Sequence, residues 1–325
     1  MTELSNEVIL IPVIPDNLQY WFVRTEGGAY FDDFYFDKFI GIGWDEFLDL
    51  EYIEKENLEK FKEQIKQKYK DEERPGLACG QMKKFVSEMK IGDIVMIPSK
   101  NSARIAFGRI MSNPYIYELT SREIEEELCQ YIKRRNVEWI TTIHRDNLDP
   151  YLFKMMYAHN TITNANIHAP FIDRIMHSLY IKGDVGHLVL QVTKEDHVGA
   201  RDLSRLIDRT ISLIEHPEVD INTDDIDVKI NVQSPGPVEF VAAAGTIFII
   251  AAVLHYIVGG KFSLKISLKE LAAKLESDGL IEKIMKLRQQ NHNNHLELTK
   301  VMDKLGVKIP TQLEPPKNEI KRPEA

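Results

Sequence analysis

The sequence predicts an α+β protein in which short strands and amphipathic helices come first, a helical and β-α-β region follows, and a long apolar helix with a helical tail comes last. Three observations support this prediction. The chain has 325 residues, of which 43% are apolar, enough for two or three compact units. Aromatic and polar residues alternate around Gly27-Gly28 and Gly41-Ile-Gly43, which is typical of short strands and tight turns. A segment of eighteen residues without a charge, Val241 to Val258, comes late in the chain.

The first domain is expected at residues 18–150. Its expected elements, in order, are short strands within 20–44, amphipathic helices within 51–73 and 81–90, strands at 94–97 and 105–110, an acidic helix at 123–129 and a closing strand at 137–140. The polar turn Ser99 to Ser102 joins the two middle strands. Pro150 then marks the end of this domain, because proline breaks both helices and strands.

Residues 151–237 are expected to hold helices and then a β-α-β unit. A strand is predicted at 187–193, an amphipathic helix at 200–214 and an alternating strand at 226–232. Ser234-Pro-Gly-Pro237 ends this region. The apolar segment follows within 238–262, then a helical tail at 263–310 with a capping box at Ser267 and Glu270. Residues 311–325 are rich in proline and charge, which predicts disorder.

Composition excludes several classes of protein. With 41 basic and 50 acidic side chains the formal charge is −9. A negative net charge disfavours non-specific binding to nucleic-acid phosphates. Any nucleic-acid binding is therefore expected in a local patch or pocket. Cys79 and Cys129 lie far apart without a CxxC spacing, which favours neither a disulfide framework nor a zinc knuckle. The N-terminus has no basic leader before its short apolar run, so the chain is expected in the cytoplasm.

Several short motifs occur in one order along the first domain. They are Tyr20-Trp-Phe-Val-Arg24, Gly27-Gly28, Phe39-Ile-Gly-Ile-Gly-Trp44, Gly92-Asp-Ile-Val95, Ile105-Ala-Phe-Gly-Arg-Ile110, Tyr115 with Tyr117, and Arg134-Arg-Asn-Val-Glu-Trp139. Together they resemble the N-terminal EVE-like domain of the PUA superfamily that is fused to Mrr-type restriction proteins. The resemblance covers residues 18–148 and does not extend to the C-terminal half.

This resemblance implies a small twisted β-barrel-like sheet with flanking helices, and a pocket for a flipped, often modified, base or a related small ligand. Aromatic stacking and hydrogen bonds to the base edge hold such a ligand. The expected ligand-binding residues are four aromatic residues for stacking, three polar residues for base edges and two arginines for phosphate: Trp21, Tyr30, Trp44 and Trp139; Ser99, Asn101 and Ser102; Arg24 and Arg104. The alternative for the tryptophans is packing in the core of the sheet. Acidic residues around these motifs favour a small nucleotide or a single base over a duplex.

No catalytic residue, metal site or cofactor is expected. The nearest approach to a nuclease metal site is Asp184 with Gln191-Val-Thr-Lys194. Residues two apart share a face of a strand, so Gln191 and Lys194 point to opposite faces and the spacing is off by one. A Mrr-like restriction nuclease with a degenerate metal site therefore remains an alternative, and so does an oligomeric scaffold.

The apolar segment Val241 to Val258 is just long enough to cross a hydrocarbon core of about 30 Å at 1.5 Å per residue. This length predicts a membrane helix, although the acidic residues before it and the lysines after it conflict with a cytoplasmic first domain. The other possibilities are an oligomerisation helix and an ordinary core helix. The leading hypothesis is a sensor and effector of bacterial antiviral defence that recognises a nucleotide or modified nucleic acid and acts through a membrane-inserting helix. Its expected partners are that ligand, the inner membrane and further copies of the chain.

Overall fold

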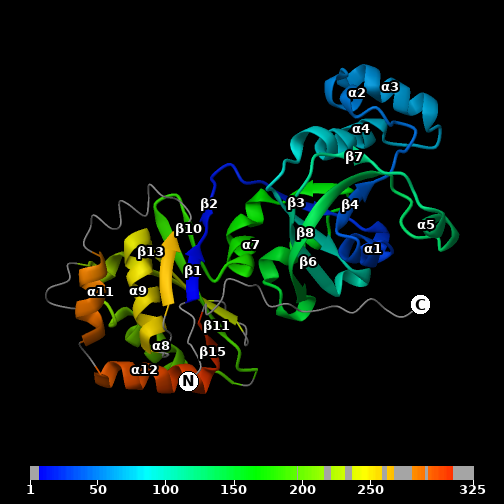
Figure 1. The fold of residues 1–325 in the computed structure, drawn as a ribbon. Helices are drawn as coiled ribbons and strands as arrows, with labels where there is room; N and C mark the ends of the chain where they lie inside the picture. The colour runs from blue at the N-terminus through cyan, green and yellow to red at the C-terminus, as the bar shows by residue number, and fades with distance from the viewer. Residues whose placement is uncertain are drawn as a thin grey trace. The chain divides into compact units, whose positions relative to one another are not determined.

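The computed structural model describes residues 7–195, 197–215, 221–230, 236–257, 262–266, 280–289 and 292–309. These residues form two compact units (Figure 1). The first unit is Leu18–Met176, and the second comprises the described residues of 7–17 and of 177–309. The first unit thus extends beyond residue 150, where the sequence placed the end of the first domain.

The first unit is built around a curved mixed sheet. Its strands follow the order β4-β8-β6-β5-β3-β9, and β7 pairs with β8. Strands β3 and β5 are parallel, and the other pairs are antiparallel. The strand bounds are β3 Tyr20–Val23, β4 Phe39–Ile42, β5 Ile94–Pro98, β6 Arg104–Ile110, β7 Tyr115–Ile116, β8 Lys133–His144 and β9 Ile162–Asn164. Because β4 and β9 lie at opposite ends of this order, the sheet is a half-barrel.

Both faces of this sheet are buried. Successive side chains along a strand point to opposite faces, so neighbouring residues enter different cores. Trp21, Val95 and Ala106 face one hydrophobic core. Phe22 and Met96, their immediate neighbours in sequence, face the other. The helices that contribute to these cores are α1 Phe31–Phe36, α2 Leu50–Lys55, α3 Leu58–Lys68, α4 Pro75–Lys83, α6 Phe153–Met156 and α7 Ala169–Met176, and the short helix α5 is Ser121–Glu125.

The structure has two helices, α2 and α3, where the sequence predicted a single helix within 51–73, because an N-cap residue between them starts the second helix. Asn57 is extended, and its side chain accepts a hydrogen bond from the Glu59 amide at 2.9 Å. Asp49 caps α2 in the same way through the Tyr52 amide. Asparagine and aspartate are preferred at this position because they satisfy amides that the first turn leaves without partners.

The basic run Lys133 to Arg135 on β8 is buried and serves the fold. Arg135 donates hydrogen bonds to the carbonyl oxygens of Phe85, Val86, Met89 and Ser112. Three of these oxygens lie in or just after the π-helical turn Lys84–Glu88. Burial lowers the pKa of Arg135 to about 10, so its guanidinium stays charged at neutral pH. The arginine therefore holds the turn that follows α4 against the sheet.

The second unit contains a six-stranded sheet and a two-stranded parallel sheet. The larger sheet follows the order β12-β13-β11-β10-β2, with β15 paired to β11, and the smaller one pairs β1 with β14. The bounds are β1 Glu7–Ile11, β2 Val13–Ile14, β10 Leu179–Lys182, β11 Val185–Val192, β12 Asp227–Ile230, β13 Gly236–Ala243, β14 Phe262–Ile266 and β15 Val307–Lys308. The helices among its described residues are α8 Ala200–Ile211, α9 Ala244–Ile257, α11 Leu280–Gln289 and α12 His292–Leu305. Figure 1 shows α9 beside the strands and α12 running below α8 and α9.

The late apolar segment is not a membrane helix, so the predicted fold class is wrong in this respect. Residues 241–243 belong to β13, and α9 spans only 14 residues, about 21 Å at the rise of an α-helix. Ile250, Ala251 and Leu254 are fully buried in the core that α9 shares with β11, β13 and α11. Among the residues that the structure describes, no helix is long and apolar enough to cross a membrane. The predicted membrane partner and inner-membrane association are withdrawn.

The helical tail is described only in part. Within the helical tail expected at 263–310, the described residues include the helices α11 and α12. The helix expected from Ser267 and the disordered segment expected at 311–325 lie outside the described residues.

Candidate functional site

Trp21 lies in the core, where the residue is only 2% exposed. Its indole N–H donates to the Asp93 carboxylate at 2.9 Å, and the same carboxylate accepts from the Lys90 amide. A buried indole with its one donor satisfied is a packing residue. We therefore do not propose Trp21 as a surface on which a base stacks.

The other two tryptophans are half-buried and anchored through their indole nitrogens. Trp139 donates to the Phe34 carbonyl at 2.9 Å and stacks on Tyr35 with ring centroids 6.0 Å apart. Trp44 donates to Glu72 at 3.3 Å and has a left-handed backbone, with φ 59°. Their positions as ligand-binding residues remain predictions.

Two loops of the first unit meet at one edge of the sheet. The turn Glu26–Gly28 follows β3, and the turn Lys100–Ser102 follows β5. Because β3 and β5 are parallel, their carboxyl ends lie at the same edge. The turns touch at Gly28, where an added Cβ would lie 2.3 Å from the Lys100 Cα. Only glycine fits there, so this contact depends on Gly28.

The two loops hold an uncommon backbone conformation. Glu26, Asn101 and Ser102 have left-handed φ angles of 49°, 56° and 53°, which cost free energy in residues other than glycine. The Ser99 hydroxyl accepts from the Arg104 amide at 2.9 Å and closes the second loop. Strained loops that tertiary contacts hold in this way cluster at ligand-binding sites.

An aromatic pair lies beside the first loop. Tyr131 donates its hydroxyl to Glu26 at 2.7 Å, and its ring meets Tyr30 edge-on at 5.1 Å. Burial and the Glu26 carboxylate raise the pKa of Tyr131 well above its usual value, so it remains a hydrogen-bond donor at physiological pH. Tyr131 packs closely against β4 and the residue after it, since an added Cβ at Gly41 would lie 3.0 Å from the Tyr131 Cβ and one at Gly43 would lie 3.2 Å from its ring. The bond to Glu26 joins one margin of the half-barrel to the loop after β3.

Positive charge is concentrated on the second loop and its surroundings. Lys100 and Arg104 are exposed, and among the described residues neither side chain has a hydrogen-bond or ion-pair partner. Arg145 approaches the Asn101 carbonyl at 3.5 Å. Arg24, by contrast, donates to the Ala158 carbonyl and is half-buried. We call the surface formed by Glu26, Tyr30, Lys100, Asn101, Arg104, Tyr131 and Arg145 the loop face.

The loop face contains three of the residues predicted from the sequence, Tyr30, Asn101 and Arg104, with Ser99 and Ser102 shaping its second loop. Sequence reasoning missed Glu26, Lys100, Tyr131 and Arg145. Glu26 and Tyr131 are 105 positions apart, and no local pattern marks such a pair. The Gly-Gly pair after Glu26 was the signal available for the first loop.

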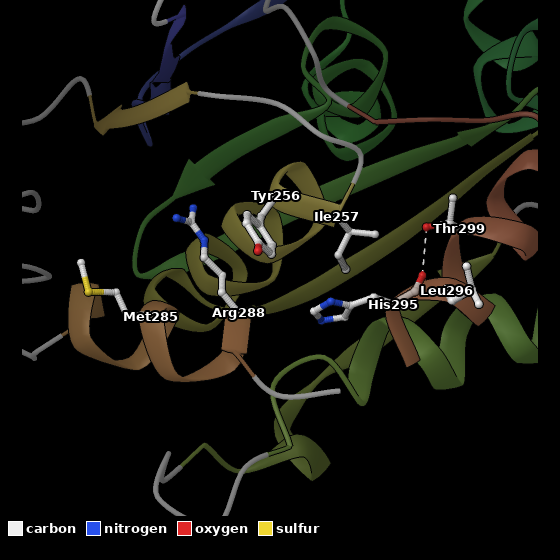
Figure 2. A pocket seen from close by; sticks show the side chains of 7 residues that line it. All are labelled: Tyr256, Ile257, Met285, Arg288, His295, Leu296 and Thr299. Carbon is white, nitrogen blue, oxygen red and sulfur yellow. Dashed lines mark hydrogen bonds between the residues drawn. The ribbon is translucent and has the colours of Figure 1, made fainter. Parts of the chain in front are cut away.

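The second unit contains a separate hollow of about 780 Å³ between the end of α9, α11 and the start of α12. Its described lining residues are Tyr256, Ile257, Met285, Arg288, His295, Leu296 and Thr299 (Figure 2). No cluster of three or more His, Cys, Asp or Glu side chains that could hold a metal ion occurs within the described ranges.

Both cysteines are buried and reduced, and we expect them not to react in the folded protein. Burial raises the pKa of the Cys129 thiol to about 12 and raises that of Cys79 as well. Because the thiolate is the reactive form, a thiol reagent such as dithionitrobenzoate at pH 8 should modify neither residue until urea is added. Rapid reaction of one thiol in native buffer would contradict this burial.

No curated protein matches the chain. One family model does: residues 21–166 are similar to a domain of unknown function, DUF8426, and this span takes in the curved sheet and both loops of the loop face.

Proposed function

We propose that the loop face binds a nucleotide or a single base of nucleic acid, and that the protein acts in recognition and not in catalysis. The observation that carries this proposal is the contact between the two strained loops. It joins the exposed cations Lys100 and Arg104 to the aromatic pair Tyr30 and Tyr131 through Glu26. The resemblance to EVE-like domains, which remains a prediction, supports the same ligand class.

Each group on the loop face suits one part of a nucleotide. Lys100 and Arg104 have donors for phosphate oxygens. The rings of Tyr30 and Tyr131 offer apolar surface for a base. The Asn101 amide and the Glu26 carboxylate can read donors and acceptors on a base edge. Stacking with one or two polar contacts is how single bases are commonly held.

The charge distribution favours a small ligand over a duplex. Duplex binding draws its affinity from many phosphate contacts, whereas the chain carries a formal charge of −9. The loop face contains three cationic side chains, Lys100, Arg104 and Arg145, and one anionic side chain, Glu26. A few phosphate contacts and one stacked base fit this balance.

The hypothesis drawn from the sequence combined recognition of a ligand with action through a membrane-inserting helix, and only the recognition is proposed. The proposal no longer includes membrane insertion, because α9 is buried in the second unit. A role as a sensor in bacterial antiviral defence and self-association stay predictions.

The double substitution Lys100→Ala with Arg104→Ala should weaken nucleotide binding at least about tenfold, because hydrogen bonds to charged groups contribute roughly 1.5–3 kcal/mol each. Titration calorimetry of the full chain would use the 5′-monophosphates of adenosine, guanosine, cytidine and thymidine, and a short single strand containing 5-methylcytosine. The slope of log affinity against log salt for the strand should fall by roughly 1.4, about 0.7 for each lost phosphate contact.

The matched control is Lys66→Ala with Lys70→Ala, which removes two exposed lysines in and just after α3. It should leave affinity within about twofold, and both double variants should keep the stability of the parent, since exposed substitutions change it by roughly 0.5 kcal/mol or less. The proposal fails if none of the probes binds the parent chain, or if the control pair loses as much affinity as the loop-face pair.

A further inference from the structure

The hollow of the second unit gathers exposed apolar side chains. Tyr256, Met285 and Leu296 are 46%, 58% and 50% exposed, and they come from three different helices. Large apolar side chains exposed together in one concavity mark a binding surface. The volume of about 780 Å³ lies within the range of roughly 300–1,000 Å³ that small-molecule sites occupy.

The same hollow is cationic. The Arg288 guanidinium lies 5.1 Å from the centre of the Tyr256 ring, and its Nε is buried without a hydrogen-bond partner. The His295 ring meets Tyr256 edge-on at 6.5 Å. Figure 2 shows Arg288 and His295 extending from different helices toward this ring. Of the described residues that line the hollow, none carries a carboxylate.

An apolar hollow with a guanidinium and an imidazole selects a particular ligand chemistry. Guanidinium groups bind planar oxyanions with two donors at once and stack on aromatic rings. Tyr256 offers a ring surface, and Met285 has a polarizable thioether that packs well against aromatic rings. A neutral apolar molecule would leave the buried Arg288 Nε without a hydrogen-bond acceptor, and a small inorganic anion would leave the apolar rim uncovered.

We infer that this hollow binds a planar organic anion, that is, a ring system with a carboxylate or a similar anionic group. The anionic group contacts Arg288, and the ring lies against Tyr256, Met285 and Leu296. The site is independent of the loop face, because it lies in the other unit and shares no residue with it.

The test compares 2-naphthoate with 2-naphthylmethanol, which has the same ring system without the charge. Calorimetry or fluorescence titration of the full chain should show naphthoate binding at least about tenfold tighter than the alcohol. Arg288→Gln should abolish this preference. Lys283→Gln removes a cation from the same helix that does not line the hollow, and it should leave the preference unchanged.

Leu296→Glu provides a second variant that does not depend on the packing of Arg288. Leu296 is half exposed, so the protein should fold, and the new carboxylate should weaken naphthoate binding by about tenfold or more through repulsion. Lys100→Ala with Arg104→Ala should leave naphthoate binding intact, which separates this site from the loop face. The inference is overturned if naphthoate does not bind at millimolar concentration, or if Arg288→Gln keeps the preference for the anion.

Discussion

Arg135→Met is expected to destabilise the first unit by roughly 3–5 kcal/mol, the range for removing one member of a buried charged network. The guanidinium donates to the Phe85 carbonyl at 2.8 Å, to Met89 at 2.8 Å, to Ser112 at 3.0 Å and to Val86 at 3.1 Å. Methionine fills the space of the aliphatic stem but donates nothing. Four carbonyl groups then lose a charged partner, and three of them lie in or just after the π-helical turn Lys84–Glu88, where the last carbonyls of a helix have no intrahelical partner.

The three tryptophans make this measurement specific. Trp21, Trp44 and Trp139 are the only tryptophans in the sequence, and all of them belong to the first unit. Urea unfolding of the full chain followed by tryptophan fluorescence therefore reports the stability of that unit. Arg104→Met is the control, because it makes the same chemical change at an exposed position on β6, and its midpoint should hardly move. A shift below about 1 kcal/mol for Arg135→Met would show that the carbonyl network contributes little.

Ile250→Ala is expected to destabilise the second unit by about 2–5 kcal/mol. Ile250 is fully buried at the middle of α9, in the core formed with the strands and with α11. Removal of its side chain leaves a cavity that the surrounding sheet and helices fill only in part. The effect is large because most of the apolar residues of α9, Ile250 among them, are buried in this core.

Scanning calorimetry would resolve this change as a lower midpoint for the transition that does not alter tryptophan fluorescence. The matched control is Ile230→Ala on β12, because Ile230 is 44% exposed and its loss should cost no more than about 0.5 kcal/mol. Equal and small effects at both positions would mean that α9 is not a core helix.

Local patterns in the sequence predicted individual elements well where their signal is local. The apolar run at 94–97 is strand β5, Ile94–Pro98, and the amphipathic pattern over 200–214 is α8, Ala200–Ile211. Period-two and period-3.6 spacing depend only on neighbours in the chain. The division of the helix expected within 51–73 was not predicted, and it follows from the N-cap at Asn57.

The candidate site was predictable only in part, because its geometry depends on residues far apart in the chain. Sequence motifs pointed to Tyr30, Asn101 and Arg104. The contact of Gly28 with Lys100 and the bond from Tyr131 to Glu26 could not be read from spacing. Trp21 shows the same limit, since its burial against Asp93 follows from the pairing of β3 with β5.

By itself the sequence determined that residues 241–258 are apolar and uncharged, and that the chain has too little positive charge for a general grip on nucleic acid. Only the tertiary structure decided what covers the apolar segment. Its first residues complete β13, and the helix that follows packs against β11, β13 and α11. A buried core helix and a membrane helix need the same apolar side chains. What distinguishes them is whether protein or lipid surrounds those side chains, and that depends on contacts between distant parts of the chain.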